Sequence, residues 1–238
     1  MKRWIIGFVG ILILASSLEA AQIYATFTVQ AKQDASLAFS SSGTIENIYV
    51  DTTAEVKKGE KLAVLKDEDL KSALQVARTA LKYAKIDYDR QKKVKNIVSK
   101  FEFDKYALKY ETAKAQLRYQ RSLLDKTVLK APFDGVIYDK LVEVGDVVSG
   151  QMVKTAFKIQ SKTARKLVLE FDQRYWKIVK VGQIFKYKVD GDGTTHEGKI
   201  SKIYPSASSS NRKMRAEVAT KDFVTGLFGD GYIQKVGK

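Results

Sequence analysis

The chain has 238 residues, a formal net charge of +15 and no cysteine. Its length suggests one or two compact units, and a composition of 45% hydrophobic and 29% charged residues is that of a globular protein, neither disordered nor a multispan membrane protein. The lack of cysteine excludes a disulfide framework, a cysteine-based zinc site and a thiol nucleophile. With one histidine, neither a polyhistidine metal site nor a histidine-based triad is expected.

The first twenty residues predict export. A basic Met-Lys-Arg start is followed by an apolar run at 4–15 and by small residues up to Ala20. This is the pattern of a secretory signal peptide over residues 1–20. The apolar run is shorter than the roughly 20 residues that cross a bilayer as a helix, so an uncleaved anchor in the inner membrane is the lesser alternative. We therefore expect a periplasmic protein whose basic surface meets anionic lipid or acidic protein, and no nucleic acid.

Residues 35–66 and 128–160 resemble each other. In each segment a glycine, Gly43 or Gly135, precedes a valine by 13 residues, and short runs rich in valine and isoleucine lie between turn residues. Such runs predict strands. The similarity of the two segments predicts a small β-sandwich made of two equivalent halves.

Several residues of these halves are expected to have structural roles only. Thr53 of the first half occupies the position of Gly145 in the second, which predicts a less sharp turn in the first half. Pro132 is expected to end the helical segment that precedes the second half. The residues assigned to structural turns are Gly43, Gly59, Pro132, Gly135 and Gly145.

The segment between the halves, residues 67–127, is rich in good helix formers and predicts two helices with a break at residues 96–99. Ser99, with Glu102 three residues later, forms a capping box at the start of the second helix. Three- and four-residue spacing of apolar and small residues predicts an antiparallel coiled-coil hairpin of roughly 45 Å. The predicted packed positions are Leu70, Ala73, Ala77, Ala80, Ala84, Val94 and Val98 in the first helix, and Phe103, Tyr106, Tyr110, Ala113, Leu117, Gln120 and Leu124 in the second.

The last part of the chain alternates strand-like runs with glycine- and serine-rich turns. Together, residues 22–34 and 161–235 predict a small closed β-barrel, with one short helix at 174–179. His196 is expected in a loop, where a metal site would need further ligands. No nucleophile and base can be paired in the sequence, so no enzyme activity and no cofactor is expected. The predicted strands are residues 167–171, 183–189, 198–204 and 214–218.

This order of segments resembles the periplasmic adaptor, or membrane-fusion, proteins of the HlyD-like family, which serve tripartite efflux pumps and type I secretion systems. The motifs that carry the resemblance are Gly43-Thr-Ile and Val56-Lys-Lys-Gly-Glu-Lys-Leu, then Lys130-Ala-Pro-Phe-Asp-Gly-Val and Gly145-Asp-Val-Val. The resemblance implies a mainly β fold, in which a long antiparallel helical hairpin splits a lipoyl-like sandwich and a β-barrel follows. The membrane-proximal domain of many such adaptors is expected to be absent or vestigial.

The resemblance also implies partners. A family member bridges an inner-membrane transporter and an outer-membrane channel, usually as a ring of six copies, and its hairpin tip docks on the channel. Arg90, Val94 and Ser99 match the family's tip motif best, although valine replaces the usual leucine and Ser99 comes about two residues early. The alternative is that Val94 and Val98 only close the end of the coil.

Other functions fit the sequence less well. Lipoyl and biotinyl carrier domains share the split β-sandwich, but they present a modifiable lysine where this chain has the helical segment 67–127. A nucleic-acid-binding protein would suit the charge, but the predicted export opposes it and the basic residues are spread along a rod. The remaining alternative to the adaptor is a periplasmic coiled-coil scaffold that takes no part in transport.

Overall fold

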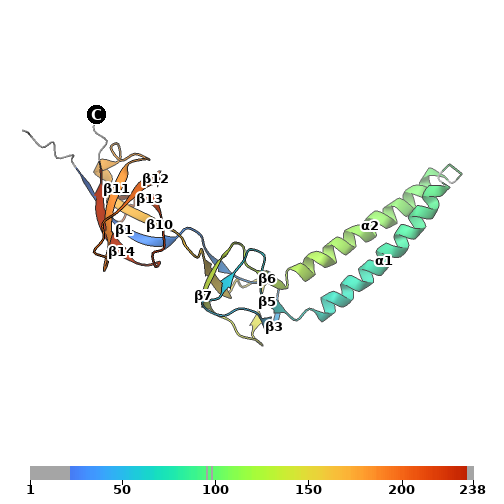
Figure 1. The fold of residues 1–238 in the computed structure, drawn as a ribbon. Helices are drawn as coiled ribbons and strands as arrows, with labels where there is room; N and C mark the ends of the chain where they lie inside the picture. The colour runs from blue at the N-terminus through green and yellow to red at the C-terminus, as the bar shows by residue number, and fades with distance from the viewer. Residues whose placement is uncertain (1–21, 95, 98, 235–238) are drawn as a thin grey trace, which may run out of the picture. The chain divides into compact units, whose positions relative to one another are not determined.

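The computed structural model describes residues 22–94, 96–97 and 99–234, so the predicted signal peptide at 1–20 and its alternative anchor lie outside the described residues. The chain forms two compact units. One contains the residues up to Gln30 together with those from Lys166 onward, and the other is Ala31–Arg165. Figure 1 shows strands in both units and the two long helices in the second.

The first unit is a closed barrel of six strands. Buried residues alternate with half-buried or exposed ones along β1 and β10, as a strand with one buried face requires. β1 pairs antiparallel with β14, and Ile23 lies opposite Ile233, so the two ends of the described chain close the barrel. In barrel order the strands are β1 (Ile23–Ala31), β10 (Ala164–Asp172), β13 (Lys213–Lys221), β12 (His196–Ile203), β11 (Ile184–Val189) and β14 (Phe228–Ile233).

Two details of the barrel differ from the sequence prediction. The expected helix at 174–179 is a short 3₁₀ helix, η1 (Gln173–Tyr175), followed by turns. The strand β14 was not predicted because its glycines resemble a turn. They are needed for space, since a Cβ at Gly229 or Gly231 would lie 2.2 Å from a carbonyl oxygen of the neighbouring strand β11.

The second unit contains a sandwich of two four-stranded sheets whose equivalent strands follow the same order. One sheet is β2 (Asp34–Leu37), β9 (Phe157–Gln160), β7 (Gly135–Lys140) and β4 (Glu55–Val56); the other is β6 (Val128–Lys130), β5 (Lys61–Leu65), β3 (Gly43–Ile48) and β8 (Val147–Val148). The repeats exchange strands, because Gly43 pairs with Val148 and Val56 pairs with Gly135. Each half therefore completes the sheet of the other.

The turns of the two repeats are equally sharp, contrary to the prediction for Thr53. Thr53 has φ 74° and Gly145 has φ 95°. The two amides make equivalent hydrogen bonds, from Thr53 N–H to the carbonyl of Ile137 at 2.7 Å and from Gly145 N–H to that of Ile45 at 2.9 Å. The symmetric hydrogen bonds hold a β-branched residue in the left-handed region that it usually avoids.

Three of the assigned turn residues have other roles. Gly43 and Gly135 begin strands β3 and β7, and neither has a positive φ. At Gly135 the reason for glycine is space, since a Cβ would lie 2.4 Å from the carbonyl oxygen of Gln160. Pro132 follows β6 and does not end the helix. The helix ends at Asp125, where the Thr127 hydroxyl donates a hydrogen bond to the carbonyl of Leu124.

The two helices, α1 (Glu68–Lys93) and α2 (Lys100–Asp125), each have 26 residues and pack along one another (Figure 1). All seven positions predicted to pack in α2 are half-buried. In α1, Ala77 and Ala84 are buried, but Ala80 is exposed and its neighbour Leu81 is half-buried in its place. Val98 lies outside the described residues.

Candidate functional site

The end of α1 is basic and is closed by a turn. Arg90, Lys92 and Lys93 lie in its last turn, where positive charge is favourable beside the exposed carbonyl groups. Val94 caps the helix, and its N–H donates to the carbonyl of Gln91 at 3.1 Å. The N–H of Ile97 then donates to the Val94 carbonyl at 2.9 Å, so the chain reverses direction tightly.

The start of α2 is fixed by Ser99, as the sequence predicted. Ser99 has an extended backbone, and its hydroxyl oxygen accepts a hydrogen bond from the N–H of Glu102 at 3.2 Å. The carbonyl of Ser99 also accepts the N–H of Phe103 at 3.1 Å. Because an N-cap satisfies amides that have no partner within the helix, α2 begins at a defined residue close to the turn.

An aromatic cluster holds the two helices together below the turn. Tyr88 of α1 stacks on Tyr110 of α2 with ring centroids 5.2 Å apart, and it also contacts Phe103 at 5.6 Å. Lys109 Nζ lies 3.2 Å from Asp87 Oδ2 and adds an ion pair between the helices. These contacts hold α1 and α2 together next to the turn.

The structure places all three residues of the predicted tip motif at this end of the helices. The Arg90 side chain is 75% exposed, with its Nη1 3.8 Å from Asp87 Oδ1, which is a long contact of low energy at the surface. Val94 is 39% exposed, and Ser99 is exposed and serves as the N-cap. Ser99 thus has a clear structural role, whereas Arg90 and Val94 present side chains to the surroundings.

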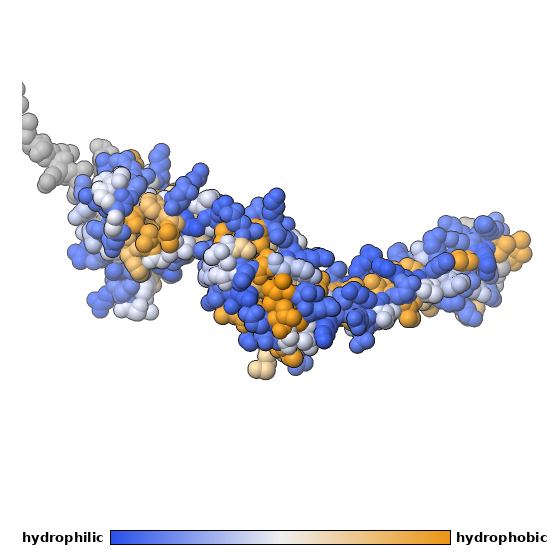
Figure 2. All heavy atoms as spheres, turned by 60° about the horizontal axis from the view of Figure 1, so that its bottom comes forward, coloured by the Kyte–Doolittle hydropathy of each residue, from blue (hydrophilic) through white to orange (hydrophobic). Residues whose placement is uncertain are grey.

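Two residues at this end were missed by the sequence analysis. Ile97 is 86% exposed and Phe101 is 82% exposed, so they exceed the other exposed large hydrophobic residues of the described chain. Figure 2 shows hydrophobic surface at the end of the helices where the chain turns. The sequence could have indicated their exposure only indirectly, since both residues fall off the three- and four-residue spacing of the packed positions. We refer to Arg90, Val94, Ile97 and Phe101 as the tip surface.

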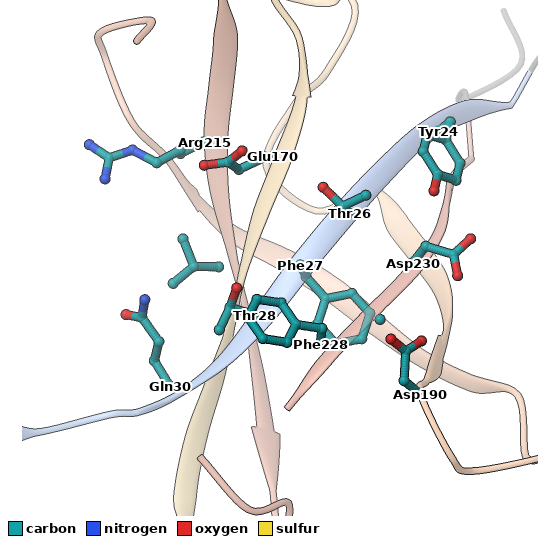
Figure 3. Close-up of a pocket in the computed structure, with 12 residues that line it drawn as sticks. Tyr24, Thr26, Phe27, Thr28, Gln30, Glu170, Asp190, Arg215, Phe228 and Asp230 are labelled. Atoms are coloured by element: carbon teal, nitrogen blue, oxygen red, sulfur yellow. The ribbon is translucent and has the colours of Figure 1, made fainter. Parts of the chain in front are cut away.

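The barrel carries a separate groove on its outer face, formed by alternate residues of β1 and its neighbours (Figure 3). The groove has a volume of about 560 Å³. Figure 3 shows Asp190 and Asp230 at one side and Glu170 with Arg215 at the other. Partial burial and the Asp230 carboxylate raise the pKa of Tyr24 in its wall. The groove is therefore mainly acidic, in contrast to the helices.

His196 lies at the start of β12 and not in a loop as expected. Its Nε2 is 2.8 Å from Asp192 Oδ2, and its ring packs against Tyr187 and Phe223. The hydrogen bond from His196, with further bonds from Thr194, lowers the pKa of Asp192 to about 2. Across the described residues no three or more metal-ligating side chains come together.

These features define a class of protein in which one chain combines a split β-sandwich that carries a helical pair with a six-stranded barrel. Residues 33–160, more than half of the chain, match the CzcB-like, barrel-sandwich hybrid domain family. The chain belongs to this family of membrane-fusion, or periplasmic adaptor, proteins of efflux systems.

Curated relatives agree with the family. The chain is 29% identical over 125 residues to the cobalt-zinc-cadmium resistance protein CzcB of Cupriavidus metallidurans, a match that covers 45% of this chain and 24% of that protein. It is 25% identical over 191 residues to an uncharacterized protein of Haemophilus influenzae, with coverage of 79% and 50%. The chain thus spans half or less of the length of these relatives.

Solved structures share the fold. A MacA-MexA chimeric protein that contains the Pseudomonas aeruginosa MexA α-hairpin domain is 22% identical, with a TM-score of 0.83, and the match covers 90% of this chain and 82% of that one. The membrane fusion protein Spr0693 of Streptococcus pneumoniae is 16% identical, with a TM-score of 0.74 and coverage of 90% and 100%. Of the helices in the described residues, none is long and apolar enough to cross a membrane.

Proposed function

We propose that this chain is the periplasmic adaptor of a tripartite efflux or type I secretion system. In this proposal it bridges an inner-membrane transporter and an outer-membrane channel, as a ring that is usually of six copies, and α1 and α2 form a coiled-coil hairpin whose tip docks on the channel. Membership of the adaptor family supports the role, and the tip surface is the observation that carries the docking site.

The tip surface has the properties of a docking site for a protein. Ile97 and Phe101 expose apolar area on a turn that Ser99 and the aromatic cluster below it hold in place. A fixed conformation reduces the entropy lost on binding. Arg90, Lys92 and Lys93, in the last turn of α1, add positive charge at the same end of the helices. The expected partner surface is therefore an apolar pocket or groove bordered by acidic or carbonyl groups.

The contact with the transporter is assigned to the barrel. The barrel belongs to the compact unit that does not carry the helices, so it is free to bind a different partner. Its acidic groove differs in charge from the basic helices, as a site for a different partner should. In the proposed ring, the side-by-side contacts between copies are heterologous, so each copy must offer two different surfaces to its two neighbours.

Photo-crosslinking in cells tests the docking site. A photoreactive residue at position 101 replaces an 82% exposed phenylalanine, and so leaves the N-cap at Ser99 and the packed positions intact. Position 119 is the matched control, because Tyr119 is 57% exposed and lies on the same face of α2, five turns or about 27 Å away. We expect position 101, and not position 119, to capture an outer-membrane channel, identified by mass spectrometry.

The other outcomes are equally informative. Capture of the same channel from both positions would contradict a site at the tip. Capture of soluble proteins alone from position 101, in cells where the transporter and channel are present and the protein is folded, would contradict the tripartite role. That result would favour the alternative of a periplasmic coiled-coil scaffold.

A further inference from the structure

A second group of exposed apolar residues lies on the barrel, in the segment that follows β10 and η1. Trp176 is 60% exposed, Ile178 is 41% exposed and Val181 is 61% exposed. Three large exposed apolar side chains thus occur within six residues, and exposed apolar residues that gather in this way can mark an interaction site. None of the three belongs to the tip surface or to the acidic groove.

The segment that carries these residues is firmly held. Val179 is buried in the barrel core and Tyr175 packs against it. Gln183 is only 4% exposed, its side-chain oxygen accepts the N–H of Lys180 at 2.8 Å, and its amide group donates to the carbonyl of Ile178 at 3.3 Å. The exposure of Trp176 and Ile178 is therefore a property of a fixed backbone and not of a loosely packed loop.

Basic residues alternate with the apolar ones. Arg174, Lys177 and Lys180 lie in the same segment, and Lys177 Nζ is 5.1 Å from the centre of the Trp176 ring. The acidic residue next to the segment, Asp172, is paired with Arg174 at 2.8 Å, and this hydrogen bond lowers the pKa of Asp172. We refer to Arg174, Trp176, Lys177, Ile178, Lys180 and Val181 as the Trp176 surface.

The neighbouring structure extends the surface. A hollow of about 510 Å³ beside Trp176 is lined by Pro205, Ala207 and Met214 and also by the polar residues Asp172, Gln173 and Arg174. A second groove next to it is lined by Gln22 together with Arg174 and Tyr175.

We propose that the Trp176 surface binds the headgroup region of an anionic lipid bilayer. Tryptophan prefers the membrane–water interface, where its ring contacts acyl chains and its N–H meets polar headgroups. The lysines beside it attract anionic lipid, and the hollow offers room for acyl-chain or headgroup atoms. This proposal goes beyond docking on a channel and is independent of it, because it concerns the barrel and a lipid surface.

Fluorescence of Trp176 tests the proposal directly. The chain has two tryptophans, so in the full-length Trp4→Phe variant Trp176 is the only one. The probe is a vesicle of phosphatidylcholine with about one third phosphatidylglycerol, in which some acyl chains are brominated near the headgroup. We expect these vesicles to quench Trp176 and to shift its emission to the blue, and we expect vesicles of phosphatidylcholine alone to do neither.

Charge variants in the same background test the basic residues. If each lysine near the surface contributes as in other proteins, Lys177→Gln/Lys180→Gln lowers the affinity for anionic vesicles about thirtyfold. The matched control is Lys188→Gln/Lys221→Gln, which removes two exposed lysines of β11 and β13 outside the Trp176 surface and is expected to bind nearly as the parent does.

Three results would overturn the proposal. The first is vesicle binding without quenching of Trp176, which would mean that residues 1–21 or another part of the chain binds the lipid. The second is an equal loss of affinity in both lysine pairs, which would indicate an unspecific effect of net charge. The third is equal quenching by anionic and neutral vesicles. Failure of this test leaves the crosslinking result at position 101 unaffected.

Discussion

Asp192 and His196 form a contact whose strength depends on the protonation of Asp192. Its pKa in the folded protein is about 2, below the ordinary 3.8, because His196 and Thr194 donate hydrogen bonds to the carboxylate. A lowered pKa means that the contact stabilises the fold above about pH 4 and that this contribution is lost as the pH falls toward 2. We predict that His196→Ala raises the pKa of Asp192, as measured by carboxyl carbon NMR during a pH titration.

The rise is expected to be incomplete. In the His196→Ala variant the N–H of Thr194, 2.9 Å from Asp192 Oδ1, still favours the charged carboxylate. The pKa should therefore stay somewhat below 3.8. An unchanged pKa near 2 would show that His196 does not donate to Asp192 in solution.

Gly43 and Gly135 occupy equivalent positions of the two repeats but have different surroundings. An added Cβ would lie 2.4 Å from the Gln160 carbonyl oxygen at Gly135, and at ordinary contact distance, 3.4 Å from Leu65, at Gly43. We predict that Gly135→Ala lowers the stability of the sandwich by about 1–3 kcal/mol through overpacking. Gly43→Ala should be neutral or stabilising by up to about 1 kcal/mol, since alanine restricts the unfolded chain more than glycine does.

Chemical denaturation of the two alanine variants, followed by a probe in the sandwich, compares these free energies of unfolding. Equal effects at the two positions would contradict the difference in space.

Gly43 and Gly135 also show why sequence alone misjudged single residues. The repeat was visible in the spacing of Gly43 and Gly135, but whether a position needs a turn or needs space depends on the strand that lies opposite. Thr53 likewise gave no local sign of a positive φ, which is imposed by its hydrogen bond to Ile137.

At the scale of the element, the start of α2 depends on a single hydroxyl group. Ser99→Ala removes the acceptor for the Glu102 N–H, and the loss of such a cap costs about 1 kcal/mol. We predict faster amide hydrogen exchange in the first turn of α2 and unchanged exchange near Asp125. Ser99→Asp is the matched control, because a carboxylate accepts the same bond and is favoured at a helix N-terminus. Equal exchange in the two variants would contradict the capping role.

The helices were the most predictable elements because their periodicity repeats over 26 residues. In α2 the three- and four-residue spacing marks the packed positions, and the exposed Phe101 and Tyr119 fall off it. In α1 the alanines occur on several faces, so alanine content did not distinguish the exposed Ala80 from the buried Ala77 and Ala84. The tip surface was predicted only in part. The Arg90, Val94 and Ser99 pattern came from a family resemblance, whereas Ile97 and Phe101 became evident when their exposure was seen.

At the scale of the whole molecule, the described chain has two hydrophobic cores with no shared residue. Residues such as Leu169 and Phe185 form the barrel core, and residues such as Leu62 and Ile159 form the sandwich core. The barrel was predicted from alternating strands, although β14 was hidden by its glycines. The division into two cores depends on contacts between residues that lie far apart in the sequence, such as Ile23 with Ile233, which no local pattern reveals.

Two separate cores predict that substitutions in one unit leave the other unchanged. Leu169→Ala and Leu62→Ala each remove a fully buried side chain, at a cost of about 2–5 kcal/mol. In scanning calorimetry we expect two transitions, with Leu169→Ala lowering only one Tm and Leu62→Ala only the other, and additive effects in the double variant because distant sites do not couple. A single transition that both variants shift would mean that the units unfold together. Independent units would let the tip surface and the Trp176 surface be altered separately, so that docking and lipid binding can be tested in the same protein without mutual interference.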